Sequence, residues 1–105
     1  MRMILGSLVA LGLATTAFAA QKLGEAQGER TPDIVYAKTC GYCHGRNVGP
    51  ILLGRKLPVD YITMTARAGR NGMPAFRPTE ITTAEMAALA KWISKSKASK
   101  QEHGQ

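Results

Sequence analysis

The sequence predicts a small all-α domain of three to four short helices. Three observations lead to this fold class: helix-start signals open three segments, an apolar stripe of helical period follows the last of them, and no stretch shows the alternation of a strand. The chain has 105 residues, of which 45% are hydrophobic and 20% charged, so the composition is that of one ordinary globular domain.

Residues 1–19 are predicted to be an export signal peptide. Arg2 gives a positive start, residues 3–13 are apolar, and Ala17-Phe18-Ala19 has the small-x-small pattern of a cleavage site. An uncleaved membrane anchor is the alternative, because residues 3–20 carry no charge over 18 residues, the lower limit for a span. The small residues near the end of the run favour cleavage, so we expect a periplasmic protein without a membrane anchor.

Two polar segments flank the expected folded domain, which spans residues 31–97. Residues 20–30 contain two glycines and no periodicity, which predicts a flexible N-terminal arm, and residues 98–105 are expected to form a flexible tail. Removal of 19 residues from 105 leaves 86 for folding. A domain this small usually needs disulfides, a metal or a large apolar cofactor for stability.

The first helix is expected to begin at Thr31-Pro32-Asp33, which supplies an N-cap, a proline at the first helical position and an acid in the first turn, and to continue to the cysteines. Pro58 can open a second helix, and Gly69 supplies a left-handed stop. Residues 45–54 and 70–81 contain the turn residues of loops.

The third helix has the strongest local signals. Thr82-Thr83-Ala84-Glu85 is a capping box, and it precedes apolar residues at i, i+3, i+4 and i+7, namely Met86, Leu89, Ala90 and Ile93. This spacing predicts a helix with one face packed on the core.

Both cysteines lie in Cys40-Gly41-Tyr42-Cys43-His44, the C-x-x-C-H pattern of covalent c-type haem attachment. Residues at i, i+3 and i+4 share a helix face, so two thiols can reach the two vinyl groups of one porphyrin while the imidazole points at the iron. A thioredoxin-like dithiol would need β-α-β units that this chain lacks. A disulfide or zinc site is a further alternative, but two cysteines with His44 and His103 make a poor tetrahedral set. We therefore predict one covalently attached haem c.

His44 is the expected proximal ligand, and its other ring N–H should bond to a backbone carbonyl, for which Pro50 is the candidate. A plain loop proline is the alternative. Met73, in the turn-rich Asn71-Gly72-Met73-Pro74, is the expected second axial ligand, with an open or water-bound iron as the alternative. Met64 and Met86 lie on expected helices, where methionine ordinarily fills the core. His/Met ligation fills both axial positions, so such an iron exchanges electrons and activates no substrate.

Positive charge is concentrated in the middle of the chain. The formal net charge is +7, and residues 40–79 carry one acid, Asp60, against six bases, which are Arg46, Arg55, Lys56, Arg67, Arg70 and Arg77. In an exported chain this excess favours an acidic protein partner over nucleic acid, and a merely solvated basic face is the alternative. Arg55 and Arg70 are candidates to bind the haem propionates, although both can equally be solvated.

The C-x-x-C-H motif, Val48-Gly49-Pro50 and Met73-Pro74 together resemble the class I cytochromes c of bacteria over residues 33–97. This resemblance implies helices wrapped around one covalent haem, with the first helix crossing the last. Tyr36 and Trp92 are then the expected aromatic contact at that crossing, because such a pair buries a large area.

Residues 49–55, Leu57-Pro58 with Tyr61-Ile62, Arg67-Ala68-Gly69 and residues 73–76 resemble a narrower family. It comprises the cytochrome subunits of p-cresol methylhydroxylase and related alkylphenol or eugenol hydroxylases. The resemblance implies a non-catalytic subunit of a hetero-oligomer, which accepts electrons one at a time from a flavoprotein carrying covalent FAD and passes them to a soluble acceptor. A freely diffusing cytochrome c serving a respiratory oxidase or another periplasmic dehydrogenase is the main alternative, and a haem enzyme or gas sensor is a further one.

Overall fold

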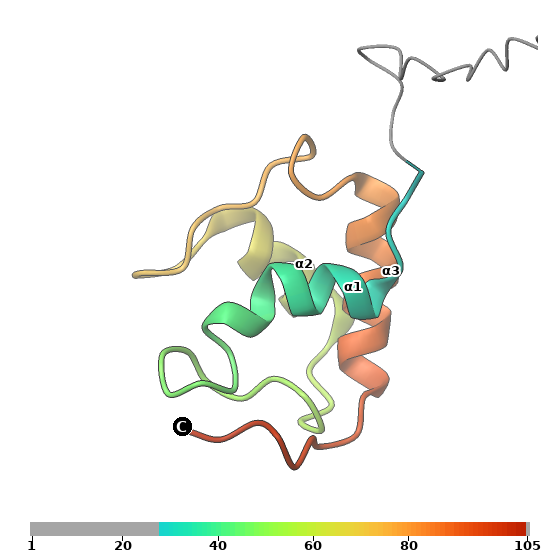
Figure 1. Ribbon diagram of the computed structural model, residues 1–105. Helices are drawn as coiled ribbons and strands as arrows, with labels where there is room; N and C mark the ends of the chain where they lie inside the picture. Colours follow the sequence, from blue (N-terminus) through green and yellow to red (C-terminus); the bar gives the residue numbers. More distant parts are fainter. Residues whose placement is uncertain (1–27, 105) are drawn as a thin grey trace, which may run out of the picture.

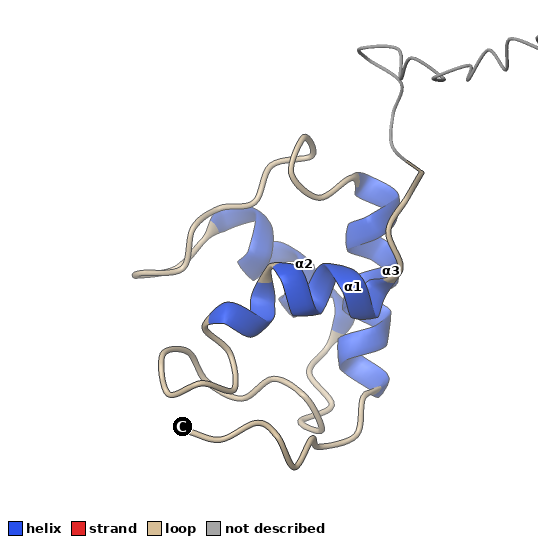
Figure 2. Cartoon of the chain, viewed as in Figure 1, coloured by secondary structure: helices blue, strands red, loops and turns tan. Residues whose placement is uncertain are grey.

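The computed structural model describes residues 28–104, which form three α-helices, one short 3-10 turn and, within that range, isolated bridges but no β-strand (Figures 1 and 2). The elements in chain order are α1 (Pro32–Lys38), the 3-10 turn η1 (Cys40–Tyr42), α2 (Val59–Ala68) and α3 (Thr83–Lys95). The predicted all-α class is confirmed. The predicted signal peptide and most of the predicted arm lie outside the described residues.

Helix α1 begins as its sequence predicts and ends earlier than expected. Thr31 is an extended N-cap with φ −67° and ψ 152°, and Pro32 is the first helical residue. The helix was expected to reach the cysteines, but Thr39 leaves the helical region at φ −129°, and the first cysteine lies in the tighter turn η1. An added Cβ at Gly41 would lie 3.3 Å from the Tyr36 carbonyl oxygen, so this turn packs closely on α1.

Helix α2 follows Pro58 and ends at Gly69, whose φ of 73° is the left-handed stop that the sequence predicts. Ile62 and Ala66 are four residues apart and share the buried face. The prediction that Met64 fills the core is wrong, because its side chain is 70% exposed. Met64 is two positions from each buried residue, and a helix turns by about 200° over two residues, so it lies on the opposite face.

Helix α3 supplies the main core face. The capping box is present, with the Glu85 N–H donating to Thr82 Oγ1 at 3.0 Å and the Thr82 N–H donating to Glu85 Oε2 at 3.1 Å. All four residues of the predicted stripe are buried. The predicted contact at the helix crossing is also confirmed: the Tyr36 and Trp92 ring centroids are 5.3 Å apart and the planes are tilted by 50°. Figure 1 shows α1 lying across α3.

The last residue of the predicted N-terminal arm is anchored to the start of α3. The Arg30 backbone N–H and Nε donate to Glu85 Oε1 at 2.9 and 3.0 Å, and Arg30 Nη2 donates to Glu85 Oε2 at 2.9 Å. Glu85 is only 5% exposed, and these bonds satisfy a carboxylate that would otherwise be costly to bury. Hydrogen bonds from Arg30 are the main cause that lowers the pKa of Glu85 to about 2.

The C-terminal segment differs from its prediction. Residues 98–105 were expected to form a flexible tail, but within the described part the His103 N–H donates to the Gly45 carbonyl at 3.0 Å and the Tyr36 hydroxyl donates to Glu102. The hydrogen bonds of His103 are made by backbone groups, which every residue type has. Composition and hydrophobic periodicity therefore could not predict them. The segment therefore packs against the loop that follows η1.

None of the helices within residues 28–104 is both long enough and apolar enough to cross a membrane.

We expect Arg30→Met to lower the free energy of unfolding by about 2 kcal/mol at pH 7, because it removes a charged partner from a buried carboxylate. The pKa of Glu85 is about 2 in the folded protein against an ordinary 4.5, so its ionised form stabilises the fold above pH 4.5, and this contribution is lost as the pH falls from 4.5 through 2. The difference between wild type and variant should therefore nearly vanish at the acid end of that window. Urea unfolding at pH 7 and at about pH 2 measures this difference in the free energy of unfolding, with the exposed Lys91→Met as control. An equal loss at both pH values would contradict the assignment.

Candidate haem site

A cavity of about 500 Å³ lies between the turn η1, helices α2 and α3 and the loops that connect them. This volume lies within the usual range for cofactor pockets. Its walls come from the end of α1, both loops, α2 and one face of α3, and the lining residues are Thr39, Cys40, Cys43, His44, Val48, Gly49, Pro50, Leu52, Leu57, Tyr61, Ile62, Thr65, Ala66, Arg70, Asn71, Gly72, Met73, Pro74, Phe76, Leu89 and Ile93. Most of these side chains are apolar, which suits a large flat hydrophobic group.

The turn η1 places both cysteines and His44 on one wall. The Cys43 and His44 N–H groups donate to the Cys40 carbonyl at 3.2 and 3.0 Å, so the three residues belong to one tight turn. Cys40 is half-buried and Cys43 is exposed at the rim. Burial raises the pKa of the Cys40 thiol to about 11, which keeps it neutral as a free thiol. The spacing predicted from the C-x-x-C-H motif therefore produces two thiols and one imidazole beside the same cavity.

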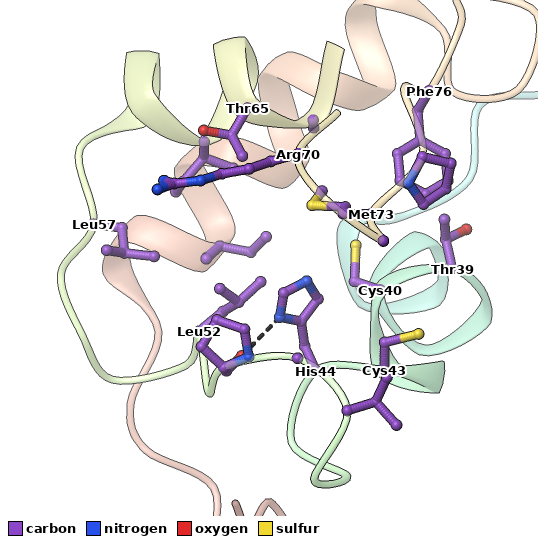
Figure 3. A pocket seen from close by; sticks show the side chains of 18 of the residues that line it. Thr39, Cys40, Cys43, His44, Leu52, Leu57, Thr65, Arg70, Met73 and Phe76 are labelled. Carbon is purple, nitrogen blue, oxygen red and sulfur yellow. Dashed lines mark hydrogen bonds between the residues drawn. The ribbon is translucent and has the colours of Figure 1, made fainter. Parts of the chain in front are cut away.

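A hydrogen bond to the following loop fixes the orientation of the His44 imidazole. Its Nδ1 lies 2.7 Å from the Pro50 carbonyl oxygen, as the dashed line in Figure 3 shows, and because a carbonyl can only accept, Nδ1–H is the donor. This is the contact that the sequence analysis predicted between these two residues. The tautomer leaves the lone pair of Nε2 available to a metal. A Cβ at Gly49 would lie 3.0 Å from two ring atoms, so this glycine leaves room for the imidazole.

Met73 reaches the cavity from a tight turn after α2. Backbone bonds of 3.0 and 2.9 Å join Arg70 and Met73 in both directions, and Asn71 takes φ 53°, which asparagine tolerates better than most residues. Neither Met64 nor Met86 lines the cavity. Figure 3 shows the side chains of Met73, His44 and Cys40 facing a common space.

Arg67 is a residue of the site region whose role sequence reasoning missed. Its Nη1 donates to the Phe76 and Ile81 carbonyls at 3.0 and 2.9 Å, and its Nη2 donates to the Thr82 carbonyl at 3.3 Å. In the sequence, Arg67 stands out only as part of the basic excess and of the Arg67-Ala68-Gly69 segment of the family resemblance. The guanidinium instead binds the returning end of the loop that carries Met73, and no local motif indicates carbonyl partners 9 to 15 residues away.

The two arginines proposed for the propionates lie in different places. Arg70 lines the cavity, and its side chain extends across it toward Leu57 in Figure 3, away from the cysteines. Its Nη1 lies 3.5 Å from the Tyr61 hydroxyl oxygen. Arg55 is exposed and does not line the cavity.

The residues present fit a haem. An apolar cavity of suitable size has two thiols on one wall, an imidazole with a free ring nitrogen, and a thioether, which is a soft ligand for iron. The guanidinium of Arg70 adds a positive group that can bind carboxylates. A helical domain with this donor set is that of a c-type cytochrome.

The comparison with family models agrees. A model described as "Cytochrome C oxidase, cbb3-type, subunit III" matches residues 27–93, and the chain belongs to this family of cytochromes c. Members of the cytochrome c family carry haem c.

A curated relative from Pseudomonas putida, the "4-cresol dehydrogenase [hydroxylating] cytochrome c subunit", is 39% identical over 62 residues, which are 57% of this chain and 55% of the relative. The matched region thus spans about half of the relative's length. A crystal structure of p-cresol methylhydroxylase with substrate bound contains a chain that matches with a TM-score of 0.59 and 36% identity, over 65% of this chain and 95% of that chain. A chain in a second crystal structure of p-cresol methylhydroxylase matches with a TM-score of 0.58 and 35% identity, over 63% of this chain and 93% of that chain. These matches confirm the resemblance that the sequence motifs indicate.

We expect Gly49→Ala to disturb the imidazole of His44, because the new methyl group would lie 3.0 Å from the ring. The backbone at Gly49 is not left-handed, so the effect comes from crowding, with a loss of about 1 kcal/mol of stability and a shifted Soret band in the haem-loaded protein. Gly28→Ala is the matched control, because no heavy atom lies within 4 Å of its added Cβ and the residue does not line the cavity. Thermal unfolding and absorption spectra measure both variants, and an equal response would contradict the crowding argument.

Proposed function

We propose that this chain is a periplasmic one-electron carrier with a single covalently attached haem c, and that it acts as the cytochrome subunit of a flavoprotein that oxidises or hydroxylates a phenolic substrate. The observation that carries the proposal is the convergence of two thiols, the His44 imidazole and the Met73 thioether on one apolar cavity. Bound haem supplies reversible one-electron exchange at its iron. The chain supplies attachment, ligation and orientation.

Each residue of the cavity has one part in this arrangement. The Cys40 and Cys43 sulfurs form the thioether links, and the turn that joins them places His44 at the metal. The bond from Nδ1 to Pro50 fixes the ring and makes Nε2 the ligand atom. Met73 would be the second ligand to the iron, and Arg67 holds its loop in place. An iron held by both His44 and Met73 would transfer electrons and leave substrate chemistry to the flavoprotein.

Arg70 is the better of the two propionate candidates. The carboxylates of a haem held through Cys40 and Cys43 would need a cation in the cavity wall away from the cysteines. The Arg70 side chain extends to that part of the cavity, and Arg55 does not line it. Arg55 is then a solvent-facing base.

The similar proteins support a flavoprotein as the partner of this chain. The curated relative is the cytochrome subunit of a hydroxylating 4-cresol dehydrogenase, and the matching structures are of p-cresol methylhydroxylase. We infer a hetero-oligomer with a flavoprotein carrying FAD, and a soluble redox acceptor that takes the electron onward. The predicted leader in residues 1–19 supports export to the periplasm. The basic middle of the chain suits an acidic contact surface on a partner.

Met73→Ala should abolish the Met-to-iron charge-transfer band in the far red of the oxidised protein and lower the reduction potential, because a thioether ligand favours ferrous iron. Met64→Ala is the control, since its side chain is 70% exposed and does not line the cavity. Absorption spectroscopy and a potentiometric titration measure the two effects. A band that survives in Met73→Ala, or disappears in Met64→Ala, would show that another group is the ligand.

The native protein should co-purify from a periplasmic fraction with a flavin-containing polypeptide, and addition of a phenolic substrate without oxygen should reduce the haem in that complex. Gel filtration with flavin fluorescence and the visible spectrum measure both. Elution without flavin, at the mass of a single haem-loaded chain, would instead support the freely diffusing carrier. The isolated chain with substrate is the control and should stay oxidised.

A further inference from the structure

The described C-terminal segment forms a strap along the loop that carries the haem-attachment histidine. We define the C-terminal strap as residues 99–104 and the attachment loop as residues 43–49. The His103 N–H donates to the Gly45 carbonyl at 3.0 Å, and the Asn47 N–H donates to the His103 carbonyl at 3.4 Å. In Figure 1 the chain returns from α3 and ends beside this loop. The strap thus bonds to the attachment loop on both sides of Arg46, in a parallel bridge.

Glu102 fills the space beside the residue that follows His44. Gly45 is buried and takes φ 78°, and a Cβ there would lie 2.5 to 2.8 Å from three carbons of the Glu102 side chain. The position therefore requires glycine for two independent reasons, its backbone angle and the lack of room. The close fit means that the attachment loop cannot shift toward the strap without moving Glu102.

The carboxyl group of Glu102 is bonded to the helix crossing. The Tyr36 hydroxyl donates to Glu102 Oε1, and the Tyr36 ring packs on Trp92. Burial, followed by the bond to Glu102, raises the pKa of Tyr36, so the phenol stays protonated and remains the donor. The second oxygen, Glu102 Oε2, is buried and has no hydrogen-bond partner within residues 28–104. Burying an oxygen without a hydrogen-bond partner costs free energy. The carboxyl group is therefore held in this place by its contacts with Tyr36 and Gly45.

We propose that Glu102 is a positioning residue for His44: by joining Tyr36 at the α1–α3 crossing to Gly45, it holds the attachment loop in the geometry that directs the imidazole at the iron. This inference rests on the proposed role of His44 as haem ligand. Contacts run from Trp92 through Tyr36 and Glu102 to Gly45, which is covalently joined to His44. The same loop is also held by bonds that do not involve the strap, from the Gly49 N–H to the Cys43 carbonyl at 2.9 Å and from Arg46 Nε to the Gly41 carbonyl at 2.9 Å. The strap adds the restraint at Gly45, the residue next to His44.

The test uses the haem-loaded full chain and the variants Glu102→Ala, Tyr36→Phe and Glu102→Gln. The first two remove the Tyr36 bond, while glutamine keeps the shape and an acceptor oxygen and should restore wild-type behaviour. The expected result for Glu102→Ala and Tyr36→Phe is about tenfold faster hydrogen exchange of the His44 and Gly49 amides, with a shifted reduction potential and shifted NMR signals of the His44 ring. Lys100→Ala, an exposed residue of the same strap, is the control and should change none of these.

A double-mutant cycle separates positioning from simple stabilisation. If Glu102 acts through Tyr36, the Tyr36→Phe, Glu102→Ala double variant should be no more altered in potential and ring signals than either single variant. The proposal is overturned if Glu102→Ala loses stability while the potential and the His44 ring signals stay at wild-type values. If Glu102→Ala yields no haem-loaded protein, Tyr36→Phe and Glu102→Gln give the same comparison. A wild-type protein without His44-bound haem would sink the proposed function itself, which is a different outcome from unaltered variants of a normal cytochrome.

Discussion

The packing of Tyr36 on Trp92 is the contact on which the rest of the domain depends. Helix α1 has only seven residues, and an isolated helix of that length is not stable in water, so its position comes from this crossing with α3. The C-x-x-C-H turn follows α1 after a single residue. The orientation of α1 therefore sets where the two thiols and the imidazole lie, and α3, with Leu89 and Ile93, forms the opposite part of the same cavity.

Local signals in the sequence were enough to predict the helices and most of the site. Proline at the start of α1, glycine after α2 and the capping box of α3 each act within a few residues, and each is present in the structure. The C-x-x-C-H turn and the contact between His44 and Pro50 are local in the same sense, because six residues separate the two partners. The early end of α1 was not predicted, because the sequence around Thr39 contains no glycine or proline before the cysteines that would indicate a helix end.

Contacts between distant residues escaped prediction because they depend on where the elements meet. Glu85 is recognisable as a cap residue, but its ion pair with Arg30 spans 55 positions. Arg67 looks like any surface base until the loop brings three carbonyls to it. The C-terminal strap uses backbone groups and one glutamate in a polar stretch that composition alone assigns to a loose end. The prediction for Met64 was wrong in the opposite direction. Methionine is usually a core residue, but the position of Met64 on α2 puts its side chain on the exposed face.

The basic excess of the sequence divides into different roles in the structure. Arg67 is occupied with loop carbonyls, Arg46 donates to the Gly41 carbonyl at 2.9 Å, and Arg70 faces the cavity. Each guanidinium keeps its charge while it bonds to neutral carbonyls, so these arginines combine a structural role with a contribution to the positive field that a partner meets.

The unequal exposure of the two cysteines has a consequence for electron flow. Cys40 is half-buried against the core, whereas Cys43 is exposed and Val48, on the same loop, is 74% exposed. If haem is attached through both sulfurs, as proposed, the link at Cys43 would lie in the exposed part of the wall. Tunnelling to or from a docked redox centre would then cross little intervening polypeptide there, and its rate would depend on how closely another protein approaches Cys43 and Val48.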